Sequence, residues 1–245
     1  VSGSFSITAE SDIRRTCTLT LVPNQYRKEN LDISEDGLIW LNNTVRLSIG
    51  IYQLRTKSYV YYKQGTFVFT NCSGSIAVAN HTLNISCSDM MSNLDGTKNG
   101  QLGSLTTLIP AYDEDENGHP IKYYRIRNAI ISVLSDLGKV TDYIVDEIGE
   151  ANGMEGYNSD WQNYRTQNEL WNAIPYDLEF SAGCTVLQML QQLRDLYPNI
   201  EMYFDENNVF VCQMIPSRNE DDIVLDNSFF QKHLVSENTT VDMTT

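Results

Sequence analysis

The sequence predicts an α+β fold, in which an antiparallel β domain precedes a small α/β domain with two main helices and a β-hairpin. Residues 1–88 alternate apolar and polar side chains with a period of two, which is typical of half-buried strands. Two later segments instead space their apolar residues as one face of a helix, and strand-like runs follow the second. The change of period near residue 89 separates the two parts.

The β domain contains several short strand-like runs, of which residues 5–9, 17–21 and 45–51 alternate most regularly. Lys63-Gln64-Gly65 predicts a hairpin turn between Tyr59–Tyr62 and Thr66–Thr70. Asn80-His81 predicts a second turn in the same way. Six or seven short strands with frequent turns favour either a barrel or a sandwich.

The α/β domain is expected over residues 122–216, after a connecting excursion at 89–121 that contains an acidic loop. Its first helix has apolar residues at helical spacing, and Gly138 stands where a C-terminal cap belongs. Thr185 and Gln188 form a capping box that begins the second helix. Residues 200–204 and 209–215 predict the hairpin, and residues 217–245 predict an exit strand and a linker.

Composition excludes several classes of protein. The 245 residues include 17 Lys and Arg against 32 Asp and Glu, a net charge of −15 that weighs against binding nucleic acid. Aromatic residues make up 10% of the chain, which excludes intrinsic disorder. No apolar run has the length of a membrane span. The missing initiator Met and the polar run at 237–245 lead us to expect a piece of a longer polypeptide.

No catalytic residue, cofactor site or dedicated metal site is predicted. Nucleophile and nucleotide-binding signatures are absent from the sequence, and the five cysteines form no CxxC pair. A Cys72–Cys87 bridge stays open at this point. The acidic loop matches the first half of a calcium loop at Asp113, Asp115 and Asn117. Its twelfth position is Tyr124 instead of Glu, so a solvated acidic turn is the favoured interpretation.

Two clusters of aromatic residues are candidates for an interface, because aromatic side chains are enriched at protein interfaces and sugar-binding faces. The first cluster is Tyr59, Tyr61 and Tyr62, and the second is Trp161, Tyr164 and Trp171.

Several stretches together resemble the tail and baseplate hub proteins of bacteriophages. The resemblance begins with Gly3–Ile7 and with Ser11–Leu21, which reads Ser-Asp-Ile-Arg-Arg-Thr-Cys-Thr-Leu-Thr-Leu. It continues through the further segments Trp40-Leu41, Val45–Tyr52, Tyr62–Phe69, Leu83–Asp89, Leu94-Asp95-Gly96, Gly100, Ser181–Val186 and Tyr203-Phe204-Asp205. These segments carry a pattern of strands and turns, and they cover most of the chain.

The resemblance implies a tube-type β-barrel over residues 1–88 and a non-enzymatic structural role in the virion. Such hubs look like homotrimers in which each subunit has two barrels, so that three subunits match a sixfold tail tube. The second barrel would begin near residue 223 and continue past Thr245. The implied partners are the tail tube and other baseplate or tail-tip proteins, with assembly in the cytoplasm of the bacterial host.

Passage of the genome through the channel is implied as well, without specific binding of DNA. Thr-rich strands such as 16–20 suit one polar face toward the lumen, and acidic side chains there would repel phosphates. The alternative function is a secreted or surface carbohydrate-binding or adhesin β-domain, which would use the Trp161 cluster and calcium at the acidic loop. The two functions predict different behaviour in solution. A hub subunit should associate with its own copies into a ring, whereas a carbohydrate-binding or adhesin domain should be a monomer that binds glycans or calcium.

Overall fold

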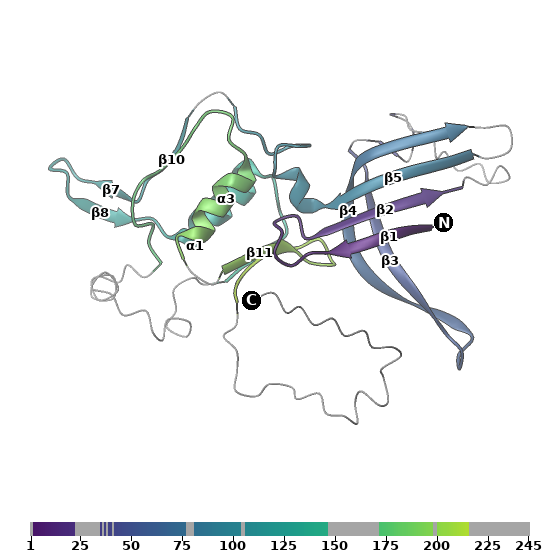
Figure 1. Ribbon diagram of the computed structural model, residues 1–245. Coiled ribbons are helices and arrows are strands. Elements are labelled where there is room, and N and C mark those ends of the chain that lie inside the picture. The colour runs from purple at the N-terminus through teal and green to yellow at the C-terminus, as the bar shows by residue number, and fades with distance from the viewer. Residues whose placement is uncertain are drawn as a thin grey trace, which may run out of the picture. The chain divides into compact units, whose positions relative to one another are not determined.

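The structure is a computed structural model, and it describes residues 2–22, 35, 37, 39–40, 42–76, 81–103, 106–146, 172–197 and 200–215. Over these residues the protein is mostly β, with a curled sheet and the two helices α1 and α3, which confirms the α+β class (Figure 1). No described helix combines the length and the apolar character that crossing a membrane requires. The predicted exit strand and linker at 217–245 lie outside the described residues.

Five antiparallel strands form the N-terminal sheet in the order β1-β2-β5-β4-β3. Their bounds are Ser2–Ile7 for β1, Arg15–Leu21 for β2, Thr44–Gln53 for β3, Ser58–Ile76 for β4 and His81–Asp89 for β5. Within the described residues the sheet does not close, because β1 and β3 remain at its two edges. A closed tube-type barrel over residues 1–88 therefore stays a prediction, which we take up below for the assembled protein.

The predicted turn at Lys63-Gln64-Gly65 is wrong, because β4 runs without a break through these residues. The chain reverses instead at residues 54–57, between β3 and β4. Gly65 has a φ of +128° and lies at a bulge, where the register against β3 shifts between Leu47 and Ser48. The glycine at this position is therefore required by a β-bulge and not by a turn. The second predicted hairpin is confirmed as a pair of strands, but His81 belongs to β5 and pairs with Ile76, so the placement of His81 in the turn is wrong.

Asp89 ends β5 and begins the 3₁₀ turn η1 (Met90–Asn93). Its carboxylate accepts the backbone N–H of Met91 at 3.0 Å and that of Arg15 at 3.1 Å. The side chain is almost completely buried, and this burial raises its pKa despite the two hydrogen bonds. Asp89 thereby fixes the path of the chain where it leaves β5 and enters η1.

The α/β part contains the two predicted helices. Helix α1 (Ile126–Ser132) passes into a π-helical turn, η2 (Val133–Leu137), and ends at Gly138, as the spacing predicts. Helix α3 (Val186–Asp195) begins with the predicted capping box. The backbone N–H of Gln188 donates to Thr185 Oγ1 at 3.1 Å, and that of Thr185 donates to Gln188 Oε1 at 2.9 Å.

The predicted hairpin is formed by β11 (Ile200–Phe204) and β12 (Phe210–Met214). The structure adds a parallel partner for β12, the three-residue strand β9 (Tyr143–Val145). Strand β6 (Thr107–Ile109) pairs with β10 (Leu178–Phe180). The acidic loop connects β7 (Tyr112–Glu114) to β8 (Pro120–Tyr123), so the 89–121 excursion contains ordered strands.

The described residues form two hydrophobic cores. The larger core lies in the α/β part, where α1, η2 and α3 pack with β11 and β12. The smaller core lies on one face of the five-stranded sheet and includes Phe67, Phe69, Ile85 and the thiols of Cys17 and Cys87. The boundaries predicted at residues 89, 122 and 216 stay predictions.

Arg15 connects the sheet to the β11–β12 hairpin. Its side chain is 8% exposed and donates to the carbonyl of Gln64 at 2.8 Å and to those of Phe204 and Asp205 at 2.5 and 3.0 Å. A Cβ on Gly65 would lie 2.4 Å from Arg15 Nη1, so a side chain at that position would displace the guanidinium. This explains why the bulge carries glycine.

Candidate functional site

The outer part of the β3–β4 hairpin, residues 49–62, is exposed on both faces; we call it the hairpin arm. On one face the rings of Tyr52 and Tyr59 lie 5.1 Å apart and those of Tyr59 and Tyr61 lie 6.1 Å apart. Tyr61 is opposite Gly50, and a Cβ there would lie 2.9 Å from its ring. The missing side chain lets Tyr61 lie flat across the strand.

The opposite face of the hairpin arm is apolar as well. Ile49 pairs with Tyr62 and Ile51 pairs with Val60, so these four side chains share one face. Ile51 is 56% exposed and Tyr62 is 51% exposed, and Leu54 at the turn is 85% exposed. A strand pair that is apolar on both faces has no core of its own to cover it. Contiguous exposed apolar surface of this kind is typical of interaction sites, so the hairpin arm is a candidate for one.

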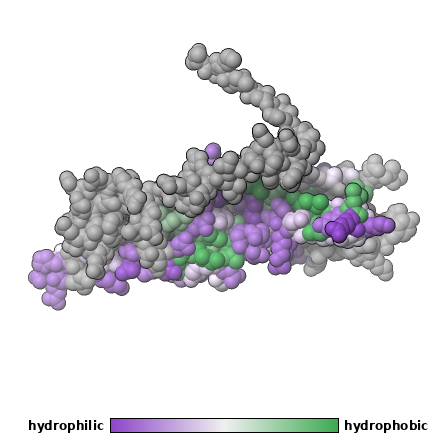
Figure 2. All heavy atoms as spheres, turned by 90° about the horizontal axis from the view of Figure 1, so that it is seen from below, coloured by the Kyte–Doolittle hydropathy of each residue, from purple (hydrophilic) through white to green (hydrophobic). Residues whose placement is uncertain are grey.

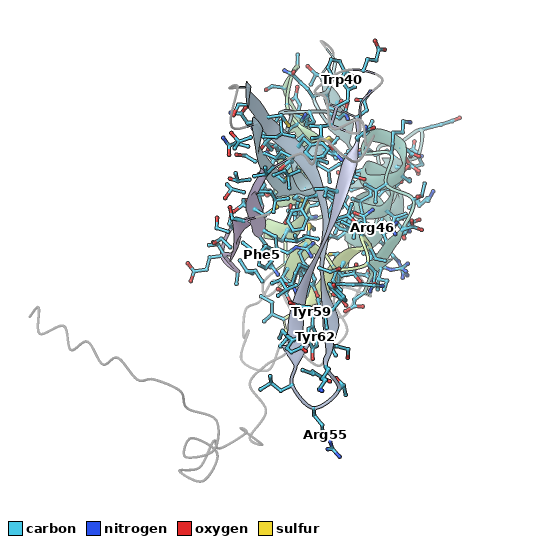
Figure 3. All side chains as sticks on the ribbon, turned by 90° about the vertical axis from the view of Figure 1, so that its right-hand side faces the viewer. Phe5, Trp40, Arg46, Arg55, Tyr59 and Tyr62 are labelled. Atoms are coloured by element: carbon cyan, nitrogen blue, oxygen red, sulfur yellow. The ribbon has the colours of Figure 1, made fainter. Side chains whose placement is uncertain are left out.

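The turn of the hairpin arm is polar apart from Leu54. In Figure 3 Arg55 stands at the extreme end of the hairpin, and Tyr59 and Tyr62 lie behind it along the strands. Figure 2 looks toward this end of the molecule, where hydrophobic residues lie beside a hydrophilic tip. Two of the three predicted interface tyrosines, Tyr59 and Tyr61, therefore share one face, and Tyr62 lies on the other. The sequence analysis did not name Tyr52, Ile49 and Ile51 as interface candidates. Period-2 alternation nevertheless places Tyr52 on the face of Tyr59, and the two isoleucines on the face of Tyr62.

The face of the sheet opposite its core carries hydroxyl groups; we call it the hydroxyl face. Ser4 Oγ lies 2.7 Å from Thr18 Oγ1, and Thr20 Oγ1 donates to Asn84 Oδ1 at 2.9 Å. Over β1, β2 and β5 the described side chains on this face are neutral and polar. They are Ser2, Ser4, Ser6, Thr16, Thr18, Thr20, Thr82, Asn84, Ser86 and Ser88. No carboxylate and no basic group is among them.

The sheet also presents two unpaired edges within the described residues, β1 on one side and β3 on the other. Each edge has backbone N–H and C=O groups directed away from the sheet, which is a template for pairing with another chain. The edges are not equivalent, because β3 carries the hairpin arm and β1 is a six-residue strand. A head-to-tail contact between two copies of the chain would therefore join β1 of one copy to β3 of the next.

In the acidic loop, the carboxylate oxygens predicted as calcium ligands accept hydrogen bonds from the protein itself. Asp115 Oδ1 accepts the backbone N–H groups of Asn117 and His119, both at 2.8 Å, and these bonds lower the pKa of Asp115. Tyr124, which occupies the twelfth position, donates its hydroxyl to Asp113 at 2.8 Å. In the described part of the chain no three His, Cys, Asp or Glu side chains converge as metal ligands would. Calcium at Asp113, Asp115 and Asn117 stays a prediction without support from this geometry.

The second aromatic cluster, Trp161, Tyr164 and Trp171, lies outside the described residues. The carbohydrate-binding alternative depended on it. Of the two aromatic clusters, the structure describes only Tyr59, Tyr61 and Tyr62 on the hairpin arm, and their role at an interface stays a prediction.

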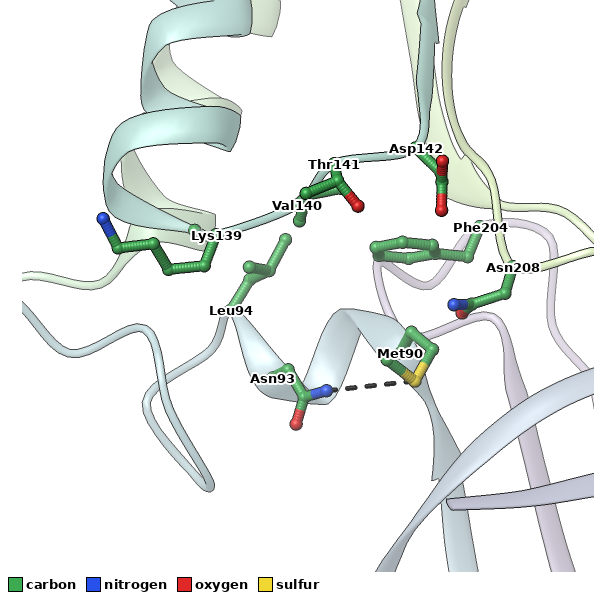
Figure 4. Close-up of a pocket in the computed structure, with 10 residues that line it drawn as sticks. Met90, Asn93, Leu94, Lys139, Val140, Thr141, Asp142, Phe204 and Asn208 are labelled. Atoms are coloured by element: carbon green, nitrogen blue, oxygen red, sulfur yellow. Dashed lines mark hydrogen bonds between the residues drawn. The ribbon is translucent and has the colours of Figure 1, made fainter. Parts of the chain in front are cut away.

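One cavity of about 150 Å³ lies between η1 and the segment that follows η2 (Figure 4). Asp142 and Lys139 supply its charged groups, and Asn93 Nδ2 lies 3.8 Å from Met90 Sδ. Its volume is below that of ordinary ligand pockets, which begin at about 300 Å³. It contains no paired nucleophile and base, so its lining gives no chemistry to assign.

A larger, open groove of about 490 Å³ runs along α1 and β6. Its lining is mainly apolar, with Lys122, Arg125 and Asp136 at separate points. No nucleophile with an adjacent base lies in it. The lining of these two cavities therefore identifies no reaction.

The five cysteines of the chain are free thiols. The open alternative of a Cys72–Cys87 bridge is not formed, since the strand register places Cys72 opposite Ile85. The residue opposite Cys87 on β2 is Cys17.

Comparison with known proteins gives two partial structural similarities. No family model matches the chain, and no curated protein matches it. Two similar solved structures are a tail protein from Neisseria meningitidis MC58, with a TM-score of 0.43 and 9% identity, and the 43 kDa tail protein of prophage MuSo2 from Shewanella oneidensis, with a TM-score of 0.39 and 12% identity. Each match covers 86% of this chain, which spans 44% and 47% of those two proteins.

Proposed function

We propose that this chain is a non-enzymatic structural subunit of a phage tail, acting at the hub that joins the tail tube to the tip. The proposal begins from the resemblance in the strand-and-turn pattern of residues 1–88 and of the later helix and hairpin. Its function would be mechanical: to associate with its own copies, with the tube and with baseplate or tail-tip proteins. The location would be the virion tail, after assembly in the host cytoplasm.

The observation that carries the proposal is the open five-stranded sheet with its apolar hairpin arm. A sheet with two non-equivalent free edges can pair β1 of one copy with β3 of the next. Such head-to-tail contacts are heterologous, and they generate a ring when the rotation closes. The tyrosines and isoleucines of the hairpin arm would then be buried against a neighbouring subunit, which removes the exposed apolar surface.

A ring of three copies would place one face of each sheet toward the channel. We assign the hydroxyl face to the lumen, because DNA phosphates are held by Lys and Arg and this face supplies neither over β1, β2 and β5. Neutral hydroxyls in place of the expected carboxylates would let the genome slide while the net charge of −15 disfavours adhesion elsewhere.

Absolute mass by light scattering, measured over a range of protein concentrations, tests the proposal. The expected result is a shift with concentration toward three times the 27.9 kDa of one chain. The double variant Tyr59→Ser/Tyr61→Ser should weaken this association at least tenfold, because two exposed aromatic anchors are removed while the core is untouched.

The matched control is Tyr176→Ser, which removes a tyrosine that is 60% exposed in the α/β part. It should associate like the unchanged chain. A mass that stays monomeric at every concentration, or equal loss of association in the control, would contradict an interface on the hairpin arm.

A further inference from the structure

Two cysteines lie directly opposite each other in the smaller core. Cys17 on β2 and Cys87 on β5 are register partners, and their side chains are 3% and 2% exposed. The same row across the sheet places Phe5 opposite Cys17 and Phe69 opposite Cys87. The two thiols are therefore enclosed by aromatic neighbours and have each other as their nearest polar partner in that row.

The spacing of such a pair suits a covalent bond. Residues directly opposite in an antiparallel ladder have Cα atoms about 4.5–5.5 Å apart. A disulfide spans Cα distances of about 4.4–6.8 Å. The hydrogen bond between the thiols lowers the pKa of Cys17, while that bond and burial raise the pKa of Cys87.

We propose that Cys17 and Cys87 form an oxidisable pair, which closes to a disulfide between β2 and β5 when the protein meets a small disulfide oxidant. The thiolate of Cys17 attacks one sulfur of the oxidant RSSR, whose S–S bond breaks and releases RS⁻. The thiolate of Cys87 then attacks Cys17 Sγ and releases the second RS⁻. Two protein thiols are oxidised by two electrons, and the oxidant leaves as two RSH that carry the two protons.

Burial determines the rate of this reaction. Both sulfurs lie under the sheet's apolar face, so the oxidant reaches them through local opening of β2 and β5. The partly exposed Cys72 is more accessible, but it is opposite Ile85 and lacks a partner thiol directly across the strand. The bridge would join two of the central strands and enclose the whole hairpin arm in one covalent loop. This inference rests on the strand register and does not depend on the proposed function.

Oxidation of the folded, full chain with oxidised glutathione tests the pair. We expect the five free thiols to fall by two, the mass to fall by about 2 Da because two hydrogens leave, and a non-reducing peptide map to join the Cys17 and Cys87 segments. The unfolding midpoint should rise, and reduction should reverse all of these changes.

Matched variants locate the bond. Cys72→Ser should still form the bridge, whereas Cys87→Ser should keep its remaining four thiols or carry only the glutathione mixed disulfide. A map that joins Cys72 to Cys87, or five free thiols after prolonged oxidation of the folded chain, would overturn the proposal. The map of the unchanged chain decides the matter even if a variant does not fold.

Discussion

Arg15 shows how one side chain can hold separate parts of the chain together. It lies at the start of β2, yet its guanidinium donates to carbonyls on β4 and on the β11–β12 hairpin. Its neighbours extend the same junction, because Arg14 pairs with Glu201 at 2.9 Å and Asp12 pairs with Arg194 at 2.9 Å. The two ion pairs are partly exposed, so we expect the buried Arg15 to contribute most.

Replacement of Arg15 by Met should therefore destabilise the protein by about 2–4 kcal/mol, because one buried and two partly buried carbonyls lose a charged donor. Chemical denaturation monitored by tryptophan fluorescence measures the change in the free energy of unfolding. Arg14→Met is the control and should cost roughly 0–1 kcal/mol, since its ion pair with Glu201 is partly solvated. Equal losses in the two variants would contradict a special role for Arg15.

At the scale of elements, helix α3 depends on local signals. The capping box at Thr185 and Gln188 satisfies two backbone groups at its first turn, and five residues of one face are buried. Thr185→Ala should cost about 1 kcal/mol of stability, because the N–H of Gln188 loses its acceptor. Thr185→Ser keeps the hydroxyl and should cost far less, and thermal denaturation of both variants measures the difference. A Ser variant as unstable as the Ala variant would show that the methyl group and not the cap is responsible.

Elements of this kind could be predicted from the sequence because their causes are local. Alternation identified β1, β2 and β3, and helical spacing with Gly138 identified α1 and η2. The failure at Gly65 has a non-local cause, since a guanidinium fifty residues away in the chain occupies the space beside it. Strand β9 was missed for a similar reason, because its three residues become a strand only through pairing with β12.

The exposed surface of the hairpin arm could be predicted only in part. The tyrosine cluster drew attention to residues 59–62, but the sequence could not show that both faces of this hairpin lie outside the core. That fact follows from strand length: β3 and β4 extend well past the core on the sheet. The opposition of Cys17 and Cys87 likewise needs the register of β2 against β5, which joins residues seventy positions apart.

At the scale of the whole molecule, ring assembly would bring the hydroxyl faces of three subunits around one channel. Each chain carries a charge of −15, so the assembled particle should not bind duplex DNA at physiological salt. Three lysines placed at Thr16, Thr18 and Thr20 would point to the same face of β2 and meet their counterparts from the other subunits.

We expect this triple variant to bind duplex DNA, because nine lysines would converge on one channel. Its affinity should fall with salt, with a log–log slope of about −0.9 for each phosphate that is neutralised. Fluorescence anisotropy of labelled DNA over a salt series measures the slope. The control places three lysines at Leu108, Ile144 and Tyr176, which are exposed and belong to the α/β part. Both variants have the same net charge, so binding by the control as strong as that of the β2 variant would mean that total charge, and not a shared channel face, governs contact with DNA.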